Sequence, residues 1–321
     1  MNLQSQAVRA ALFLGNHLKE SASISFGLLK VAVPAIIFTK ILEELGCIHY
    51  IGIILEPVMK LVGLPGELGL VWATALLTTP YGGIGVLAAL VPSLTLTAAD
   101  LTVLCSLILI AHSLPIEQSI TRKAGAGFLP MAAIRVFGAL GYGMLLHAIC
   151  NRFSIWQYPA ATIFRQTPEH QSLAQWALNQ CFNIFMVCLV IFAVLLAMRV
   201  LRALGVIRLC ENLLKPVLPW LGMSHRAAPV TVVGMLLGIV YGGALIIRET
   251  TEGSMDSREI FNSLALMSLS HGLIEDTMIM MALGAKLGGI LWGRLVFSLL
   301  VIYVLVRVTG LLATPRTLKG D

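Results

Sequence analysis

The sequence predicts an all-α polytopic membrane protein built from two related halves. Apolar residues make up 58% of its 321 residues and charged residues only 12%, against about 25% charged residues in an ordinary soluble domain. Several apolar stretches have the length of about 20 residues that spans a bilayer core as a helix. A third observation, an internal repeat, divides the chain into its halves. Such a composition excludes a water-soluble globule, and no basic run interleaved with aromatic residues suggests nucleic-acid binding.

The repeat relates the two halves at a nearly constant spacing of 158 to 160 residues. The matched groups are Leu45-Gly46 with Leu204-Gly205, Pro57-Val58 with Pro216-Val217, Tyr81-Gly82-Gly83 with Tyr241-Gly242-Gly243, His112 with His271, Ile116-Glu117 with Ile274-Glu275, and Arg135 with Arg294. A register this steady indicates that each half folds into the same series of elements.

Each half is expected to contain, in order, a long apolar helix, a shorter interfacial helix, a re-entrant hairpin, an unwound helix and a closing helix. In the first half these are Ile24–Leu42, His49–Val62, Ala73–Leu90, Leu101–Ile120 and Leu129–Ile149. In the second half they are Asn183–Leu201, Ile207–Leu221, Val230–Ile247, Ile260–Met281 and Ile290–Val308. The predicted organisation is an amphipathic N-terminal segment (1–22), a first repeat (23–150), a linker (151–175), a second repeat (176–312) and a C-terminal tail (313–321).

The charge of the interfacial helices predicts that the repeats are inverted. Residues 43–67 carry four acids and one base, whereas residues 202–226 carry four bases and one acid. Basic loops stay in the cytoplasm, so the first helix should lie outside and the second inside. Inverted repeats of this kind are common in secondary transporters. We expect a bacterial inner (plasma) membrane protein with both termini in the cytoplasm.

Inversion requires each half to cross the membrane an odd number of times, so only one of its two interrupted segments can cross. Glycine tolerates the positive φ of a tight turn, which favours the Pro80-Tyr81-Gly82-Gly83 segment as the hairpin tip. The segment containing His112 is then a crossing helix that is unwound in its middle. Pro115 removes a backbone donor there and enforces the break.

Irregular backbone at membrane depth survives only where it is buried in protein or lines a wet cavity, and transporters with this construction bind their substrates there. Ionisable side chains in apolar segments mark a functional site. The candidate substrate-binding residues are Thr78, Thr79, Tyr81, Gly82, Gly83, His112, Glu117, Tyr241, Gly242, Gly243, His271, Glu275 and Asp276. His271 and Glu275, four residues apart, would share one helical face, whereas His112 and Glu117 converge only if the helix breaks between them.

Structural roles compete with these assignments. The two histidines could merely cap half-helices, and Glu117 could pair with Arg122. For Arg135 and Arg294, snorkelling to an interface is favoured over pairing with the acids. A metal site is possible, since histidine plus carboxylate suits several divalent ions, but no H-E-x-x-H motif is present. Glu117 and Glu275 are assigned to a coupling ion, because a carboxylate at membrane depth needs a cation or proton to compensate it.

The architecture resembles the core of concentrative nucleoside transporters. Residues 42–66, "LEELGCIHYIGIILEPVMKLVGLPG", leading into "TTPYGGIGVL", resemble the nucleoside-recognition (Gate) domain, which also occurs in spore-maturation membrane proteins and bacterial ferrous-iron transporters. Those iron transporters carry a Gly-Cys-x-x-Pro element near the hairpin tip, where this chain has no cysteine. The resemblance implies a small, nucleoside-like solute.

The sequence therefore predicts a secondary transporter of a small polar solute, coupled to H⁺ or Na⁺ and working by alternating access. The alternatives are a divalent-metal carrier and a non-transporting membrane partner in a larger assembly. No enzymatic activity and no cofactor are expected. The expected partners are the solute, the coupling ion and membrane lipid, and a homo-oligomer is compatible with the sequence.

Overall fold

The computed structural model describes residues 3–91, 94–164, 172–224, 227–251 and 255–313. In this part of the chain the protein is helical and has no β-strand, only an isolated antiparallel bridge between Thr97 and Pro159. The elements are α1 (Leu3–Glu44), α2 (Cys47–Leu61), α3 (Leu68–Leu77), α4 (Pro80–Leu90), α5 (Ala98–Ile110), α6 (Leu114–Lys123), α7 (Phe128–Arg152), α8 (Leu173–Ala203), α9 (Val206–Leu214), η2 (Leu218–Leu221), α10 (Ala227–Leu237), α11 (Ile239–Thr251), α12 (Ser257–Ser270), α13 (Glu275–Ala282), η3 (Gly288–Gly293) and α14 (Arg294–Ala313).

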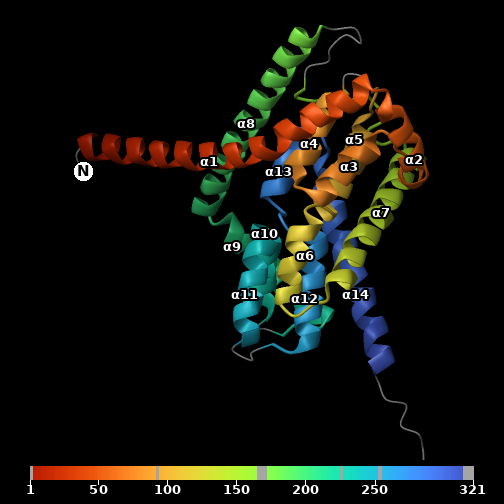
Figure 1. The fold of residues 1–321 in the computed structure, drawn as a ribbon. Coiled ribbons are helices and arrows are strands. Elements are labelled where there is room, and N and C mark those ends of the chain that lie inside the picture. The colour runs from red at the N-terminus through yellow and green to blue at the C-terminus, as the bar shows by residue number, and fades with distance from the viewer. Residues whose placement is uncertain (1–2, 92–93, 165–171, 225–226, 252–254, 314–321) are drawn as a thin grey trace, which may run out of the picture.

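Five helical segments of the described chain are long and apolar enough to cross a bilayer. They are Ser21–Glu44, Ala98–Lys123, Phe128–Arg152, Leu173–Ala203 and Gly288–Val308. The prediction of an all-α polytopic membrane protein is confirmed. Helix α1 runs without interruption from Leu3 to Glu44, so the expected N-terminal segment and the first long helix form one helix. It crosses α8 beside the bundle that the other helices form (Figure 1).

The two halves repeat each other in backbone conformation as well as in sequence. Three pairs of glycines, each 159 residues apart, adopt positive φ: Gly46 and Gly205, Gly63 and Gly222, Gly125 and Gly284. Both α5 and α12 begin with a capping box, at Thr97 and at Asp256. Such a box satisfies backbone donors at a helix start, and its recurrence at the same spacing indicates that each half starts its interrupted helix in the same way.

Each half contains a tight pair of short apolar helices, α3 with α4 and α10 with α11. Gly83 in α4 lies so close to α3 that a Cβ at this position would be 2.9 Å from the Cβ of Ala75. In the second half Gly242 of α11 packs in the same manner on Gly234 of α10. The segment Ala73–Leu90 is therefore two helices joined at Thr78 and Thr79, as expected for a hairpin. Its re-entry into a bilayer stays a prediction.

The closing helices of the two halves, α7 and α14, touch near the start of the second closing segment, where they run in opposite directions. Gly289 at the start of the second closing segment lies against Leu146 near the end of α7, and further along α14 Phe297 approaches Gly141. The Tyr142 hydroxyl donates a hydrogen bond of 2.5 Å to the Gly289 carbonyl. An antiparallel pair is what two inverted repeats require, although the orientation in the membrane stays a prediction.

The amphipathic segments after the long helices lie on the outside of the bundle. Large apolar side chains are exposed on α2 (Tyr50, Ile54) and around α9 and η2 (Leu209, Leu213 and Trp220). An exposed apolar stripe on a short helix fits a position in the plane of the membrane interface.

Candidate functional site

A cavity of about 660 Å³ lies where the hairpins meet the interrupted helices of both halves. Its walls come from the α3–α4 and α10–α11 junctions, from the breaks after α5 and α12, and from the inner face of α8. The lining residues that bear polar or charged side chains are Thr79, Tyr81, His112, Ser113, Glu117, Arg199, Arg202, His271, Glu275 and Asp276. The two hairpin junctions and the two helix breaks thus meet at one cavity, but Gly82 and Gly242, the expected tips, do not line it.

The first break separates α5 from α6 over three residues. Ser113 adopts φ +49°, a left-handed conformation, and Pro115 lies in the first turn of α6, as expected for a residue that cannot donate to the preceding turn. The freed backbone groups bond to the neighbouring hairpin: the Ser113 N–H donates to the Ala75 carbonyl at 2.9 Å, and the Trp72 indole donates to the Ala111 carbonyl at 3.2 Å. The hairpin thus supplies hydrogen-bond partners to the irregular backbone of the break, which it also helps to bury.

The second break, between α12 and α13, repeats this relation. The Leu273 N–H donates to the Met235 carbonyl of α10 at 3.0 Å, and Gly272 adopts φ +59°. Since α12 ends at Ser270 and α13 starts at Glu275, His271 and Glu275 do not share a helical face. That expectation was wrong, because the spacing of four residues counts only within one continuous helix.

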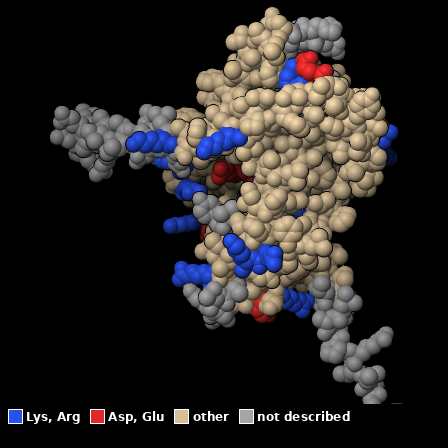
Figure 2. Space-filling model, viewed as in Figure 1, with Lys and Arg blue, Asp and Glu red and all other residues tan. Residues whose placement is uncertain are grey.

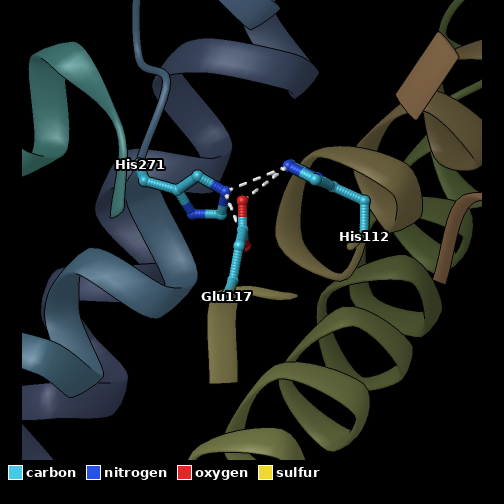
Figure 3. Close-up of side chains that lie close together, drawn as sticks. All are labelled: His112, Glu117 and His271. Carbon is cyan, nitrogen blue, oxygen red and sulfur yellow. Dashed lines mark hydrogen bonds and ion pairs between the residues drawn. The ribbon is translucent and has the colours of Figure 1, made fainter. Parts of the chain in front are cut away.

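His112, Glu117 and His271 meet at the floor of the cavity (Figure 3). The Nε2 atoms of the two histidines are 3.2 Å apart. Glu117 places Oε1 3.4 Å from Nε2 of His112 and Oε2 3.5 Å from Nε2 of His271. All three residues are buried. The convergence of His112 with Glu117 confirms that the break brings them together.

The other ring nitrogen of each histidine is held by the helix that precedes it. Nδ1 of His112 lies 2.7 Å from the Ile108 carbonyl, and Nδ1 of His271 lies 3.0 Å from the Met267 carbonyl. A carbonyl oxygen only accepts hydrogen bonds, so Nδ1 carries the proton in both rings. The histidines therefore do cap the ends of α5 and α12, and the same hydrogen bonds aim both Nε2 atoms at each other.

Arg135 and Arg294 are fully buried beside this cluster, so the expectation that they snorkel to an interface was wrong. Arg135 donates to Glu117 Oε2 and, at 2.8 Å, to the Ile110 carbonyl. Arg294 donates to the Leu109 carbonyl at 3.3 Å and to the Thr277 hydroxyl at 3.2 Å. Glu117 thus pairs with Arg135 and not with Arg122, which is exposed. The end of α5 provides carbonyl acceptors that a guanidinium can reach without water.

The hairpin tips lie slightly upstream of the predicted positions. In the first half Thr79 caps α4, accepting from the Gly82 N–H at 3.2 Å, and it lines the cavity with Pro80 and Tyr81. Thr78 instead turns back to the Thr74 carbonyl, at 2.7 Å. Gly82 and Gly83 are buried against α1 and α3, where they allow close helix packing.

In the second half the tip is Gly238, at φ +102°, with Leu237 and Ile239 beside it at the cavity. The predicted tip glycines, Gly242 and Gly243, are buried in α11 and make packing contacts. The side chain of Tyr241 lies outside the described part of the structure. Sequence reasoning missed Gly238, although the repeat spacing of 159 places it opposite Thr79.

Basic residues of α8 form a part of the cavity that the sequence did not reveal. Arg199 and Arg202, one turn apart, line it together with the acids Glu275 and Asp276. Figure 2 shows acidic side chains set back in a hollow of this face, with basic side chains around it. No pattern in the sequence connects α8 with the breaks, so only tertiary packing identifies these arginines.

Comparison with known proteins supports a membrane protein. The chain is 22% identical over 275 residues, 84% of its length and 86% of the relative, to the uncharacterized membrane protein YvoD of Bacillus subtilis (strain 168). It is 42% identical over 77 residues, 24% of its length and half of the relative, to the inner membrane protein YjiG of Escherichia coli (strain K12). No known protein family and no solved structure matches the chain.

The chain is a membrane protein. Its five long apolar helices and its similarity to bacterial membrane proteins agree on this point.

Proposed function

We propose that the protein is a secondary transporter of a small polar solute, driven by H⁺ or Na⁺. The observation that supports this proposal is the cavity itself, which joins two helix breaks and two hairpin tips at a cluster of charged side chains. Its volume of about 660 Å³ falls within the range of about 300–1,000 Å³ of small-molecule sites. Interrupted helices around a central cavity are the usual site construction of secondary transporters.

Charge suggests how solute and coupling ion would divide the cavity. The coupling role that the sequence assigned to Glu117 and Glu275 is proposed for Glu275 and for its neighbour Asp276. These two carboxylates lie at the start of α13 and line the cavity. Arg199 and Arg202 would attract a solute with an anionic or strongly hydrogen-bonding group. A nucleoside-like solute stays the first class to test, because of the Gate-domain resemblance.

The two alternative functions make different demands on the cavity. A non-transporting partner in an assembly predicts a polar cavity too small for any solute, which a volume of about 660 Å³ disfavours. A divalent-metal carrier is the second candidate, favoured by the meeting of two histidines and a carboxylate. In that case the metal is the cargo, and the test below includes it.

Uptake by proteoliposomes tests the proposal. Purified protein is reconstituted, and nucleosides, nucleobases, small organic anions and divalent metal ions are offered separately with an imposed H⁺ or Na⁺ gradient. We expect one solute class to accumulate against its gradient and to stop accumulating when an ionophore collapses the driving gradient. Accumulation that ignores both ion gradients, or no uptake of any solute by correctly folded protein, would exclude a coupled transporter of these classes.

A further inference from the structure

We infer that His112, His271 and Glu117 form a binding site for one divalent first-row transition-metal ion that links the two halves. Potential ligand atoms of the three residues lie close together. Both Nδ1 atoms donate to carbonyl oxygens, and the two Nε2 atoms are only 3.2 Å apart. When both rings are neutral, their Nε2 lone pairs face each other beside a carboxylate and repel unless a cation lies among them.

The distances are close to those around a tetrahedral ion. Ligand atoms about 2.0–2.1 Å from a tetrahedral metal lie about 3.3–3.4 Å from one another. The two Nε2 atoms are 3.2 Å apart, and Nε2 of His112 and Nε2 of His271 lie 3.4 and 3.5 Å from different oxygens of Glu117, Oε1 and Oε2. With one ligand atom from each residue, the three atoms lie within 4.8 Å of one another, so the Glu117 carboxylate would either rotate to offer one oxygen or bind the ion through both.

The surrounding hydrogen bonds also match a metal site. Histidine ligands usually donate their second N–H to a carbonyl or carboxylate, which fixes the ring, and ligating carboxylates are themselves hydrogen-bonded. Here the Ile108 and Met267 carbonyls hold the two rings, and Arg135 holds Glu117. The three ligands therefore occupy fixed positions before an ion arrives.

Charges of both signs surround the site. Three acids, Glu117, Glu275 and Asp276, favour a dication, whereas four arginines oppose it: the buried Arg135 and Arg294 and the cavity-lining Arg199 and Arg202. Two neutral imidazoles and one carboxylate suit Zn²⁺, Fe²⁺, Co²⁺ or Mn²⁺ rather than Na⁺ or Ca²⁺, which prefer oxygen ligands. The fourth position would face the cavity and take water or an oxygen or nitrogen atom of a solute.

Because His112 follows α5 and His271 follows α12, the ion would connect the two helix breaks directly. This inference goes beyond transport: an equilibrium binding measurement tests it, whereas uptake tests the proposed function. Metal binding without uptake would support the site and leave the transporter unsupported, and uptake without metal binding would do the reverse.

Cobalt binding is the experiment. The full-length protein is purified, stripped with a chelator and titrated with Co²⁺ while its visible absorption is followed. We expect one Co²⁺ per chain with the intense d–d bands of a tetrahedral ion, and no thiolate charge-transfer band. His112→Gln and His271→Gln should each weaken binding by at least about 100-fold, whereas His49→Gln, on the exposed face of α2, should bind like the wild type.

A gain-of-signal variant guards against loss of binding through misfolding. His271→Cys keeps a metal ligand at this position, so Co²⁺ should bind with a new thiolate-to-metal charge-transfer band in the near ultraviolet. The inference is overturned if the folded wild type binds no Co²⁺, if both glutamine variants bind it like the wild type, or if His271→Cys binds Co²⁺ without that band. In the first case the two rings share a proton and not a metal ion.

Discussion

At the scale of single residues, the centre of the molecule is organised by a buried ion pair, Glu117 with Arg135. Both side chains are buried: Arg135 is fully buried, and Glu117, which lines the cavity, is 8% exposed. Removing one partner of a buried pair leaves the other charge uncompensated, which costs far more than losing a pair at the surface. The pair also holds Glu117 against the two histidines, so it has a structural and a positioning role at once.

This pair gives a prediction about stability. In chelator-treated protein, Glu117→Gln should lower the free energy of unfolding by roughly 3–5 kcal/mol, because Arg135 loses its only carboxylate at hydrogen-bonding distance among the described residues. Thermal unfolding in detergent measures the loss. The matched control is Glu56→Gln, which removes an exposed pair with Lys60 and should cost less than about 1 kcal/mol.

A double variant separates charge from packing in the same measurement. Glu117→Gln combined with Arg135→Met removes both charges, so it should recover part of the stability that Glu117→Gln loses. An equal or larger loss in the double variant would show that the arginine is needed for its hydrogen bond to the Ile110 carbonyl and not for its charge.

The acids at the start of α13 give a prediction about coupling. Asp276→Asn and Glu275→Gln preserve side-chain shape and remove charge, so each should abolish gradient-driven uptake while leaving the protein folded. Solute binding, measured separately, should persist in at least one of them. Wild-type uptake in both variants under both ion gradients would remove these acids from the coupling site and contradict this part of the proposal.

At the scale of the elements, the helix breaks are stabilised by the neighbouring hairpins and not by their own sequence alone. Each break donates a backbone N–H to a hairpin carbonyl, from Ser113 to Ala75 and from Leu273 to Met235. The hairpins in turn need glycines at their packed faces and at the second tip. The loop at either helix break can therefore change shape only if its hydrogen bond to the neighbouring hairpin changes too.

Gly238, the hairpin tip of the second half, gives a prediction about the stability cost of its backbone conformation alone. A Cβ at Gly238 would meet no atom within 4 Å, yet φ is +102°, so Gly238→Ala should cost roughly 1–2 kcal/mol through strain alone. Gly27, in the middle of α1, is equally open but helical, and Gly27→Ala should be neutral or stabilising by up to about 1 kcal/mol. Thermal unfolding of the two variants makes the comparison. Equal effects would mean that Gly238 does not adopt the positive φ in the folded protein.

At the scale of the whole molecule, the antiparallel closing helices and the repeated glycine turns fit two copies of one unit packed face to face. The interfacial helices α2 and α9 each follow the long helix of their half in chain order, α1 and α8. Their opposite charge predicts opposite sides of the membrane. Two native cysteines, Cys47 in α2 and Cys210 in α9, are free and partly exposed, so they report on this topology without new reporter sites.

Two single-cysteine proteins test the orientation. With the other cysteines replaced by serine, a membrane-impermeant thiol reagent applied to intact cells should label Cys47 and not Cys210, and both should react in opened membranes. This outcome places residues 43–67 outside and residues 202–226 inside, with both termini in the cytoplasm. Labelling of both cysteines, or of neither, in intact cells would end the inverted-repeat prediction.

The sequence by itself determined the class of the protein, the order of its elements and the positions of both helix breaks. Composition and the length of the apolar runs determine whether the chain folds in water or in a lipid bilayer. Proline, glycine and charged residues inside the apolar runs determine where a helix is interrupted. The repeat spacing added the pairing of His112 with His271 and of Arg135 with Arg294. These are local or periodic properties, which the chain carries without reference to its final shape.

Only the tertiary structure decided which of these residues meet. The approach of His112 to His271, the choice of Arg135 over Arg122 as the partner of Glu117, and the presence of Arg199 and Arg202 at the cavity depend on how separate helices dock. The same holds for the second tip, where packing on Gly234 and Met267 buries Gly242 and leaves Gly238 at the turn. Contacts between residues far apart in sequence follow from side-chain volume and hydrogen-bond satisfaction over the whole bundle, which no local pattern encodes.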